Sequence, residues 1–369
     1  MAKKSFNYAQ LEAVAQEMRA NPDMVFYYEY QVPTATLPTG EVLDLAKEFG
    51  PLRTSGRGWP IDEQWITGVA IGVAAAGSKA IARLPSMATI YAIEYIQNQA
   101  GKIRSMTGGQ ASMPFVLWQD AGGRSRGSAG QHTDVGTEVL YANLPGVKVV
   151  APSDAYDAKG LMLAAIRDPD PVVYFDYPEV KAGDQPDVPD EAYVVPLGKA
   201  AVRQTGRDVT IVAWAPATVD VKKALPMLAK MGISAEFIDP RSLKPLDVPT
   251  IAESVRKTKR LLVVEHGHYT AGYGAHIACE VLQEVPNVKV RRIAFPDAPG
   301  PGAAVMMDWM RPDAPTCGRL PHSCGNAASS SPTTPGACTS RTRSAPATST
   351  RATVRRAARP THRSRAACR

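Results

Sequence analysis

The stretch VKVVAPSDAYDAKGLMLAAIRDPDPVVYFDY (residues 147–177) predicts a strand, a helix and a second strand. Its two ends, VKVVAP and PVVYFDY, are short runs rich in β-branched and aromatic residues, which favour strands. Between them, DAYDAKGLMLAAIRD has the length and the apolar spacing of a helix. This order favours two parallel strands joined by a helix that covers the sheet.

The same alternation continues on both sides of this unit. Strands are predicted at residues 24–30, 79–84, 113–119, 208–215, 234–239, 260–266 and 288–295. Helical patterns occupy residues 7–22, 63–77, 218–232, 248–259 and 272–285, and residues 90–106 are amphipathic. We therefore expect an α/β protein with two domains, at residues 1–185 and 207–315, joined by a Pro/Asp/Gly-rich linker at 186–206.

The positive net charge of +7 comes from the end of the chain. Residues 316–369 contain ten of the 42 basic residues and none of the 35 acidic ones, so the preceding body is slightly acidic. This tail is poor in apolar residues, and we expect it to be disordered. Its abrupt change of composition suggests a frameshift product. The alternative is a genuine basic arm for an acidic partner.

Composition excludes other classes for the body of the chain. No opening signal pattern and no apolar run of about 18 residues is present, so we expect a cytoplasmic protein with no membrane partner. A nucleic-acid binder would rest on the tail alone, and we expect no nucleic-acid partner. The one cysteine of the body, Cys279, lies in a helical pattern and is predicted to be a small core residue.

Two acids stand at the start of an apolar helix, in the stretch WPIDEQWITGVAIG (residues 59–72). The structural interpretation is that Asp62 caps the helix and Glu63 is a first-turn acid favoured by the helix dipole. The functional interpretation is that Glu63 presses against a group that needs it, with a pKa raised by apolar surroundings.

Histidines mark two further candidate sites. His132 lies in the polar, glycine-rich loop that follows a predicted strand, where α/β proteins place functional groups, although an ordinary loop histidine is the commoner case. His266 and His268 are two residues apart on a predicted strand, with Glu265 and His276 nearby. A metal site there lacks a visible fourth ligand and is a weak hypothesis.

Several segments together resemble the beta subunits of thiamine-diphosphate-dependent 2-oxo acid dehydrogenases, the group of pyruvate, branched-chain 2-oxo acid and acetoin dehydrogenases. The segments are WPIDEQWITGVAIGVAAAG, IYAIEYIQNQAGKIRSMTGGQ, AGQHTDVG, LPGVKVVAPSDAYDAKGLMLAAIRDPDPVV, VPLGKAAV, DVTIVAWA and IAESVRKTKRLLVVEHG. The resemblance runs from about residue 5 to about residue 315. It implies a pyrimidine-binding, doubly wound parallel-sheet domain followed by a transketolase C-terminal-like α/β domain.

The resemblance also assigns roles to residues. Glu63 is implied to hydrogen-bond the pyrimidine ring of thiamine diphosphate, where a shared proton favours the imino form that activates the cofactor. His132 is implied to face the substrate. Ile61, Thr89 and Tyr91 are implied to contact the cofactor. An aromatic residue usually stacks on the pyrimidine, but Thr89 holds that position here, and Tyr91 is the neighbouring substitute.

Metal ions and partners follow from the same resemblance. A structural K⁺ ion is implied at positions Val116, Ala165, Ile166, Asp168 and Asp170, held largely through backbone carbonyls. Mg²⁺ and the diphosphate are implied to bind to an alpha subunit in an α2β2 heterotetramer. The substrate would be a 2-oxo acid or a related ketone or acyloin, and a dihydrolipoyl acyltransferase is a further possible partner.

Two functions are consistent with this sequence. The first is the cofactor-activating beta subunit of a two-chain thiamine-diphosphate enzyme, which Glu63 and His132 favour. The alternative is a catalytically degenerate structural subunit of such a complex, which Thr89 favours.

Overall fold

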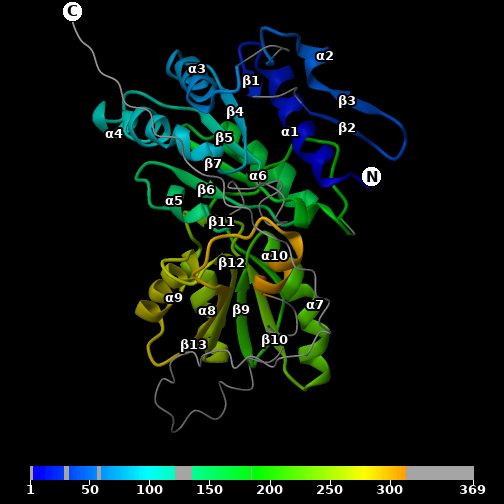
Figure 1. Cartoon of the computed structure of the whole chain (residues 1–369), viewed down its shortest axis with the longest axis vertical. Helices are drawn as coiled ribbons and strands as arrows, with labels where there is room; N and C mark the ends of the chain where they lie inside the picture. The colour runs from blue at the N-terminus through cyan, green and yellow to red at the C-terminus, as the bar shows by residue number, and fades with distance from the viewer. Residues whose placement is uncertain (1–2, 29–32, 56–59, 121–134, 184, 313–369) are drawn as a thin grey trace, which may run out of the picture. The chain divides into compact units, whose positions relative to one another are not determined.

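Two α/β layered structures succeed each other along the chain (Figure 1). The computed structural model describes residues 3–28, 33–55, 60–120, 135–183 and 185–312. The first structure has a six-stranded sheet and the second has a five-stranded sheet. Both sheets carry helices on their faces, as the alternating pattern predicts.

The first sheet is parallel except at one edge. Its strands, in spatial order, are β1 (Val25–Tyr28), β4 (Ala80–Pro85), β5 (Phe115–Asp120), β7 (Val172–Asp176), β6 (Lys148–Val150) and β11 (Ser242–Lys244). Strand β11 comes from the C-terminal half of the chain and pairs antiparallel with β6. The N-terminal sheet is therefore completed by a strand of the C-terminal half.

The strand–helix–strand unit predicted at residues 147–177 is confirmed as β6, α6 (Ala155–Arg167) and β7, with β6 and β7 adjacent and parallel. Helix α6 and helix α1 (Phe6–Ala20) share one core cluster, to which Leu11, Leu161 and Trp118 contribute. Helix α3 (Glu63–Ala75) buries Ile66 and Ala70 in a different cluster. The sheet is thus covered on both faces, which confirms the doubly wound arrangement.

Shorter elements complete the first half. They are the hairpin of β2 (Thr34–Thr36) and β3 (Val42–Asp44), helices α2 (Leu45–Phe49), α4 (Ile103–Met106) and α5 (Glu138–Ala142), and 3-10 helices at Ser86–Ala92 and Pro178–Lys181. The amphipathic segment at residues 90–106 does not form one regular helix. It continues the 3-10 helix, passes through a π-helix at Tyr95–Ala100 and ends in α4.

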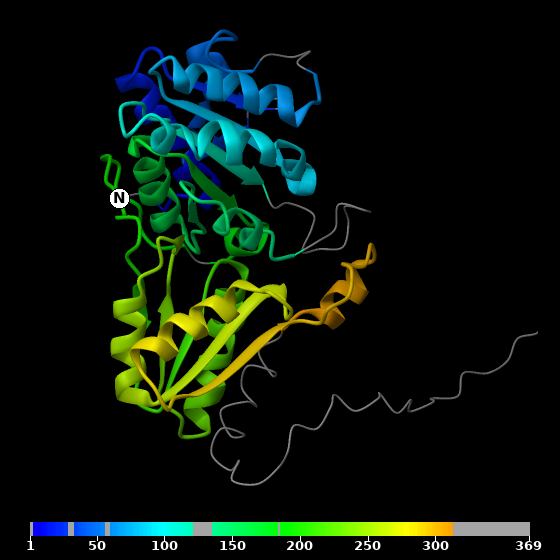
Figure 2. The ribbon, with the colours of Figure 1, turned by 90° about the vertical axis from the view of Figure 1, so that its left-hand side faces the viewer.

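The second sheet has the spatial order β13 (Lys289–Phe295), β12 (Arg260–His268), β9 (Val209–Ala213), β10 (Ala235–Asp239) and β8 (Ala201–Gln204), and only β8 is antiparallel. Its helices are α7 (Pro216–Lys230), α8 (Val248–Thr258), α9 (Tyr273–Glu284) and α10 (Ala304–Met310). Figure 2 shows α10 standing away from the sheet beyond the end of β13.

In the C-terminal half, the structure differs from two predictions made from the sequence. The segment predicted as a linker, 186–206, already contains β8, so the C-terminal sheet begins earlier than its composition suggests. Cys279, predicted to lie in the core, is exposed on α9. The helical pattern around it is correct, but Ile277, Ala278 and Val281 form the buried face of the helix instead.

A cluster of charged side chains joins the two halves of the described chain. Asp157 on α6 is fully buried and contacts both Arg203 on β8 and Arg241, which lies 3.0 Å away. Arg203 also reaches Asp154 at 3.1 Å and Asp239 at 2.9 Å. Three carboxylates thus share two guanidinium groups. Because buried charges are tolerated only with such partners, the cluster fixes α6 against β8 and β10.

Because this cluster has more carboxylates than guanidinium groups, the stability of the fold should depend on pH. Burial, together with the neighbouring charge of Asp154, raises the pKa of Asp157 to about 6. A carboxyl whose pKa is higher in the folded chain stabilises the fold at low pH and loses that contribution as pH rises through the folded pKa. The stability of the native chain relative to Asp157→Asn should therefore decrease between about pH 4 and pH 7. Denaturant unfolding of both chains across this pH range measures the difference.

The matched control is Asp23→Asn, since Asp23 is exposed. A constant difference between the native chain and Asp157→Asn across the whole pH range would contradict the assignment.

Candidate active site

The first turn of α3 places Glu63. The carboxylate of the N-cap residue, Asp62, accepts a hydrogen bond from the backbone N–H of Trp65 at 2.9 Å. The structural interpretation is therefore correct for Asp62, which satisfies a donor of the first turn. Glu63 does not cap the helix. Its carboxylate is half-buried and forms no side-chain hydrogen bond or ion pair with any residue that the structure describes.

Apolar side chains are exposed around this carboxylate. Ile61, two residues before Glu63, is 67% exposed, and Tyr91 on the facing 3-10 helix is 58% exposed. The side-chain amide of Gln64 donates to the carbonyl of Tyr91 at 3.1 Å, so α3 holds this segment in place. Thr89, in contrast, is buried. Tyr91, not Thr89, is thus the exposed side chain in the segment that Gln64 of α3 holds.

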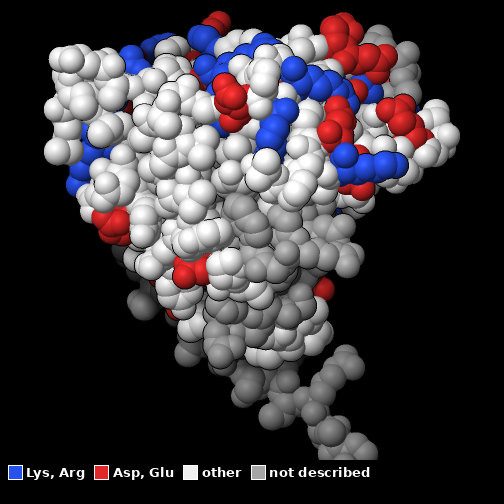
Figure 3. Space-filling view, turned by 90° about the horizontal axis from the view of Figure 1, so that it is seen from above, with Lys and Arg blue, Asp and Glu red and all other residues white. Residues whose placement is uncertain are grey.

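The surface around α3 carries fewer charged side chains than the rest of the N-terminal half. Figure 3 views this half from above, and charged side chains gather on the right, where Figure 1 places α1 and α2. Fewer charges lie on the left, where Figure 1 places α3 and α4. Trp65 and Ile90 are also exposed in this region. An exposed apolar surface near a carboxylate that has no partner among the described residues is typical of a surface that another molecule covers.

The predicted catalytic residue His132 lies outside the described residues, as do all residues from 121 to 134. The structure describes the residues on either side of this segment. At the end of β5, the side-chain amide of Gln119 donates to the hydroxyl of Thr137 at 3.1 Å, and both groups are buried. This bond ties the two ends of the segment together.

Just after that segment the chain touches the C-terminal half. A Cβ atom added to Gly136 would lie 2.6 Å from the Cα atom of Gly267, and Gly136 has a φ of +72°. Only glycine fits such a close approach without strain. Because Gly267 belongs to β12, this contact brings the carboxyl ends of β5 and β12 together.

A buried acid that sequence analysis did not single out reinforces this junction. Glu138, in the first turn of α5, accepts a hydrogen bond from the indole N–H of Trp214 at 3.3 Å. Burial raises the pKa of Glu138. Trp214 follows β9, so the bond joins the two halves beside the segment that contains His132. The sequence shows only an acid at a helix start, and the distant tryptophan is visible only in the fold.

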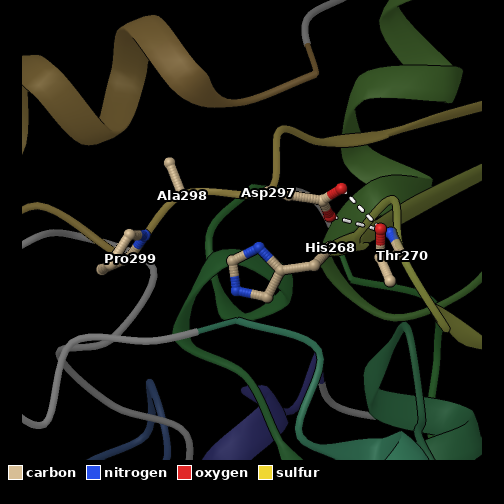
Figure 4. Close-up of a pocket in the computed structure, with 5 residues that line it drawn as sticks. All are labelled: His268, Thr270, Asp297, Ala298 and Pro299. Carbon is tan, nitrogen blue, oxygen red and sulfur yellow. Dashed lines mark hydrogen bonds between the residues drawn. The ribbon is translucent and has the colours of Figure 1, made fainter.

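A pocket of about 500 Å³ opens at the carboxyl ends of β12 and β13. Figure 4 shows His268, Thr270 and Asp297 around it. The carboxylate of Asp297 accepts from the N–H and the hydroxyl of Thr270, at 2.8 and 2.5 Å. These bonds lower the pKa of Asp297. Nδ1 of His268 lies 3.1 Å from the carbonyl oxygen of Pro296, so this nitrogen carries a proton.

The weak hypothesis of a metal site on β12 finds no support in the described part of the chain, where no group of three or more potential His, Cys, Asp or Glu ligands occurs. His266 is buried and pairs with Asp220 at 2.9 Å. Glu265 pairs with Arg292 and accepts from the N–H of Gly274. Each group already has a structural partner.

The positions expected to hold K⁺ are brought to one region. Val116, Ala165 and Ile166 belong to a single buried cluster, and Asp168 and Asp170 follow α6 directly. The ammonium group of Lys148 lies 2.6 Å from Asp168 and 3.3 Å from Asp170. The guanidinium group of Arg104 also lies 3.1 Å from Asp170, so both carboxylates already have cationic partners. The K⁺ site that the resemblance implies at these positions stays a prediction.

Comparison with known proteins identifies the family. Residues 5–178 match the family described as "Transketolase, pyrimidine binding domain", and residues 198–317 match "Transketolase, C-terminal domain". The pyruvate dehydrogenase E1 component subunit beta of Rhizobium meliloti (strain 1021) is 37% identical over 309 residues, which cover 82% of this chain and 66% of that protein. The mitochondrial subunit beta-1 of Arabidopsis thaliana is 38% identical over 300 residues, which cover 79% of this chain and 81% of that protein.

The chain belongs to the family of thiamine-diphosphate-dependent 2-oxo acid dehydrogenase beta subunits. A solved structure described as "Split gene transketolase, inactive beta4 tetramer" shares the fold, with a TM-score of 0.69 and 24% identity over 87% of this chain and 97% of that chain.

Family membership confirms the resemblance seen in the sequence and the order of the two domains. The chain spans about two thirds of the length of the Rhizobium relative. No helix in the described ranges is long and apolar enough to cross a membrane. The basic tail lies outside the described residues, so its predicted disorder and its origin stay predictions.

The contact between Gly136 and Gly267 can be tested directly. Gly136→Ala adds a Cβ at a position where φ is +72° and the neighbouring backbone is 2.6 Å away. Strain and overpacking should destabilise the fold by at least about 2 kcal/mol. Thermal and denaturant unfolding measure the change. Gly302→Ala is the control, because open space surrounds Gly302. Equal stability of the two variants would contradict the close contact.

Proposed function

We propose that this chain is the beta subunit of a two-chain thiamine-diphosphate enzyme that decarboxylates a 2-oxo acid, and that Glu63 activates the cofactor. The observation that carries the proposal is the position of Glu63. Its carboxylate stands at a helix start, is half-buried, has no partner among the described residues and lies beside exposed apolar side chains. Family membership supplies the ligand that such a carboxylate would meet.

The chain's own residues would act in the following way. Glu63 would hold a proton at the pyrimidine ring nitrogen, and the apolar surface of Ile61 and Tyr91 would exclude water from that bond once a partner covers it. Low polarity strengthens the sharing of the proton. Thiamine diphosphate, when bound, would supply the electron sink for loss of CO₂. His132 would face the substrate.

The exposed surface around Glu63 supports a partner chain. We propose that an alpha subunit covers this surface, carries Mg²⁺ and the diphosphate, and completes an α2β2 heterotetramer. Relatives named as subunits of the pyruvate dehydrogenase E1 component make pyruvate the first substrate to test. A structural K⁺ ion near Asp168 and acyl transfer to a dihydrolipoyl acyltransferase are further parts of the proposal.

The decisive experiment is Glu63→Gln in the complex assembled with its alpha subunit. The carboxamide keeps the size of the side chain but cannot share a proton in the same way. We therefore expect 2-oxo acid decarboxylation to fall by about 100-fold or more, because general acid–base groups contribute on this scale. Glu253→Gln is the control, since Glu253 is exposed on α8.

Assembly of each variant with the alpha subunit is verified by sedimentation. Unchanged activity of Glu63→Gln would refute the role of Glu63. An inactive native complex that still binds the cofactor would favour the alternative, a catalytically degenerate subunit, which the buried Thr89 supports.

Tyr91 provides a second test. If its exposed ring stacks on the pyrimidine in place of the usual aromatic residue, Tyr91→Ala should raise the Kd for thiamine diphosphate about 3- to 10-fold, the scale of one aromatic contact. Tyr91→Phe keeps the ring and should bind like the native complex. Titration of the assembled complex with the cofactor measures both values, and equal Kd values for the alanine variant and the native complex would exclude the stacking role.

A further inference from the structure

A second cavity lies between the two halves of the chain, away from α3. It has a volume of about 390 Å³, and α5, the segment around β11 and α9 line it. Figure 1 shows α5 above α9, with β11 near the junction of the two layered structures. The volume lies within the range of pockets that bind small molecules.

The cavity contains a lysine, Lys244, that has no counter-ion among the residues that the structure describes. The half-buried ammonium group of Lys244 donates to the carbonyl oxygens of Ala142, at 3.0 Å, and Leu144, at 2.6 Å. No carboxylate in the described part of the chain lies within ion-pair distance of Lys244. Burial lowers the pKa of Lys244. An ammonium group has three protons, so the carbonyls leave one to donate.

The two carbonyls have a structural explanation. They belong to the C-terminal end of α5, where a lysine often bonds the last carbonyls of a helix. That role accounts for two of the three protons. It does not account for the composition of the cavity, whose lining residues include no acid. The cavity is also lined by His276, whose ring lies 3.9 Å from the carboxylate of Glu280 outside the lining.

The remaining walls are largely apolar. Val139 comes from α5, Leu243 from β11, and Leu246 follows β11. Tyr273 contributes an aromatic ring, and its hydroxyl group already donates to the carbonyl of Leu243. A ligand that fits these surfaces has one anionic end for Lys244 and a short hydrocarbon end for the partly exposed Val139 and Leu246.

We propose that this cavity binds a small aliphatic carboxylate, with the carboxylate on the ammonium group of Lys244 and the hydrocarbon chain against Val139 and Leu246. The site is separate from Glu63, and the proposal does not depend on the function proposed above. It requires neither an alpha subunit nor thiamine diphosphate.

The test is to titrate the full chain with 3-methylbutanoate and to measure binding by calorimetry. For so small a ligand we expect saturable binding with a Kd on the order of 1 mM. Two probes separate the contributions of charge and shape. The neutral amide 3-methylbutanamide keeps the shape, and inorganic phosphate keeps a negative charge without the hydrocarbon chain. Both should bind at least about 10-fold more weakly.

Variants locate the site. Lys244→Met should weaken binding of 3-methylbutanoate about 10- to 100-fold, the range expected for a charged hydrogen bond. Leu246→Trp keeps the lysine but fills the cavity, and it should also abolish binding. The matched control is Lys223→Met, because Lys223 is exposed on α7 and should leave binding unchanged.

The proposal would be overturned by absence of saturable binding, by equal affinity for the amide, or by equal affinity for phosphate. Binding that survives Leu246→Trp would also overturn it, since the ligand would then lie elsewhere. If Lys244→Met does not fold, Leu246→Trp decides alone, because Leu246 is only partly buried.

Discussion

One hydrogen bond determines what Glu63 can do. Asp62 caps α3 by accepting from the N–H of Trp65, so the first turn of the helix already has its acidic cap. The next carboxylate is therefore available for another group. Had Glu63 served as the cap, its oxygens would be occupied by backbone donors. The proposed contact with the cofactor depends on Asp62 capping the helix, because the carboxylate of Glu63 then stays available.

Three contacts join the N-terminal and C-terminal halves of the chain. Gly136 lies against Gly267, Glu138 bonds to Trp214, and Asp157 pairs with Arg203 and Arg241. The first two contacts are made by residues that directly follow the segment of residues 121–134. Parallel sheets place functional groups at the carboxyl ends of their strands, and Gly136 and Thr137, which follow that segment, contact Gly267 of β12 and Gln119 of β5.

The order of the elements could be predicted from the sequence because each strand and helix carries its own periodicity. The stretch at residues 147–177 predicts β6, α6 and β7 in the correct order, and the resemblance to the family identifies both domains. Features that depend on distant partners could not be predicted in this way. Strand β8 lies in a Pro-rich segment, and β11 crosses to the first sheet. Cys279 is an apolar residue in a helix, but it lies on the exposed face of that helix. For the candidate site, the sequence predicts a role for Glu63, which stays a prediction. The buried state of Thr89 and the exposure of Tyr91 come from the packing of the 3-10 helix against α3.

The central claim concerns a bond between the carboxylate of Glu63 and a ring held at a subunit boundary. The most direct measurement is a crystal structure of this chain assembled with its alpha subunit and thiamine diphosphate. The account predicts an oxygen of Glu63 within about 2.6–3.2 Å of a pyrimidine nitrogen, with the carboxylate fully buried between the two chains. A carboxylate that stays in solvent, or that lies far from the cofactor, would contradict it.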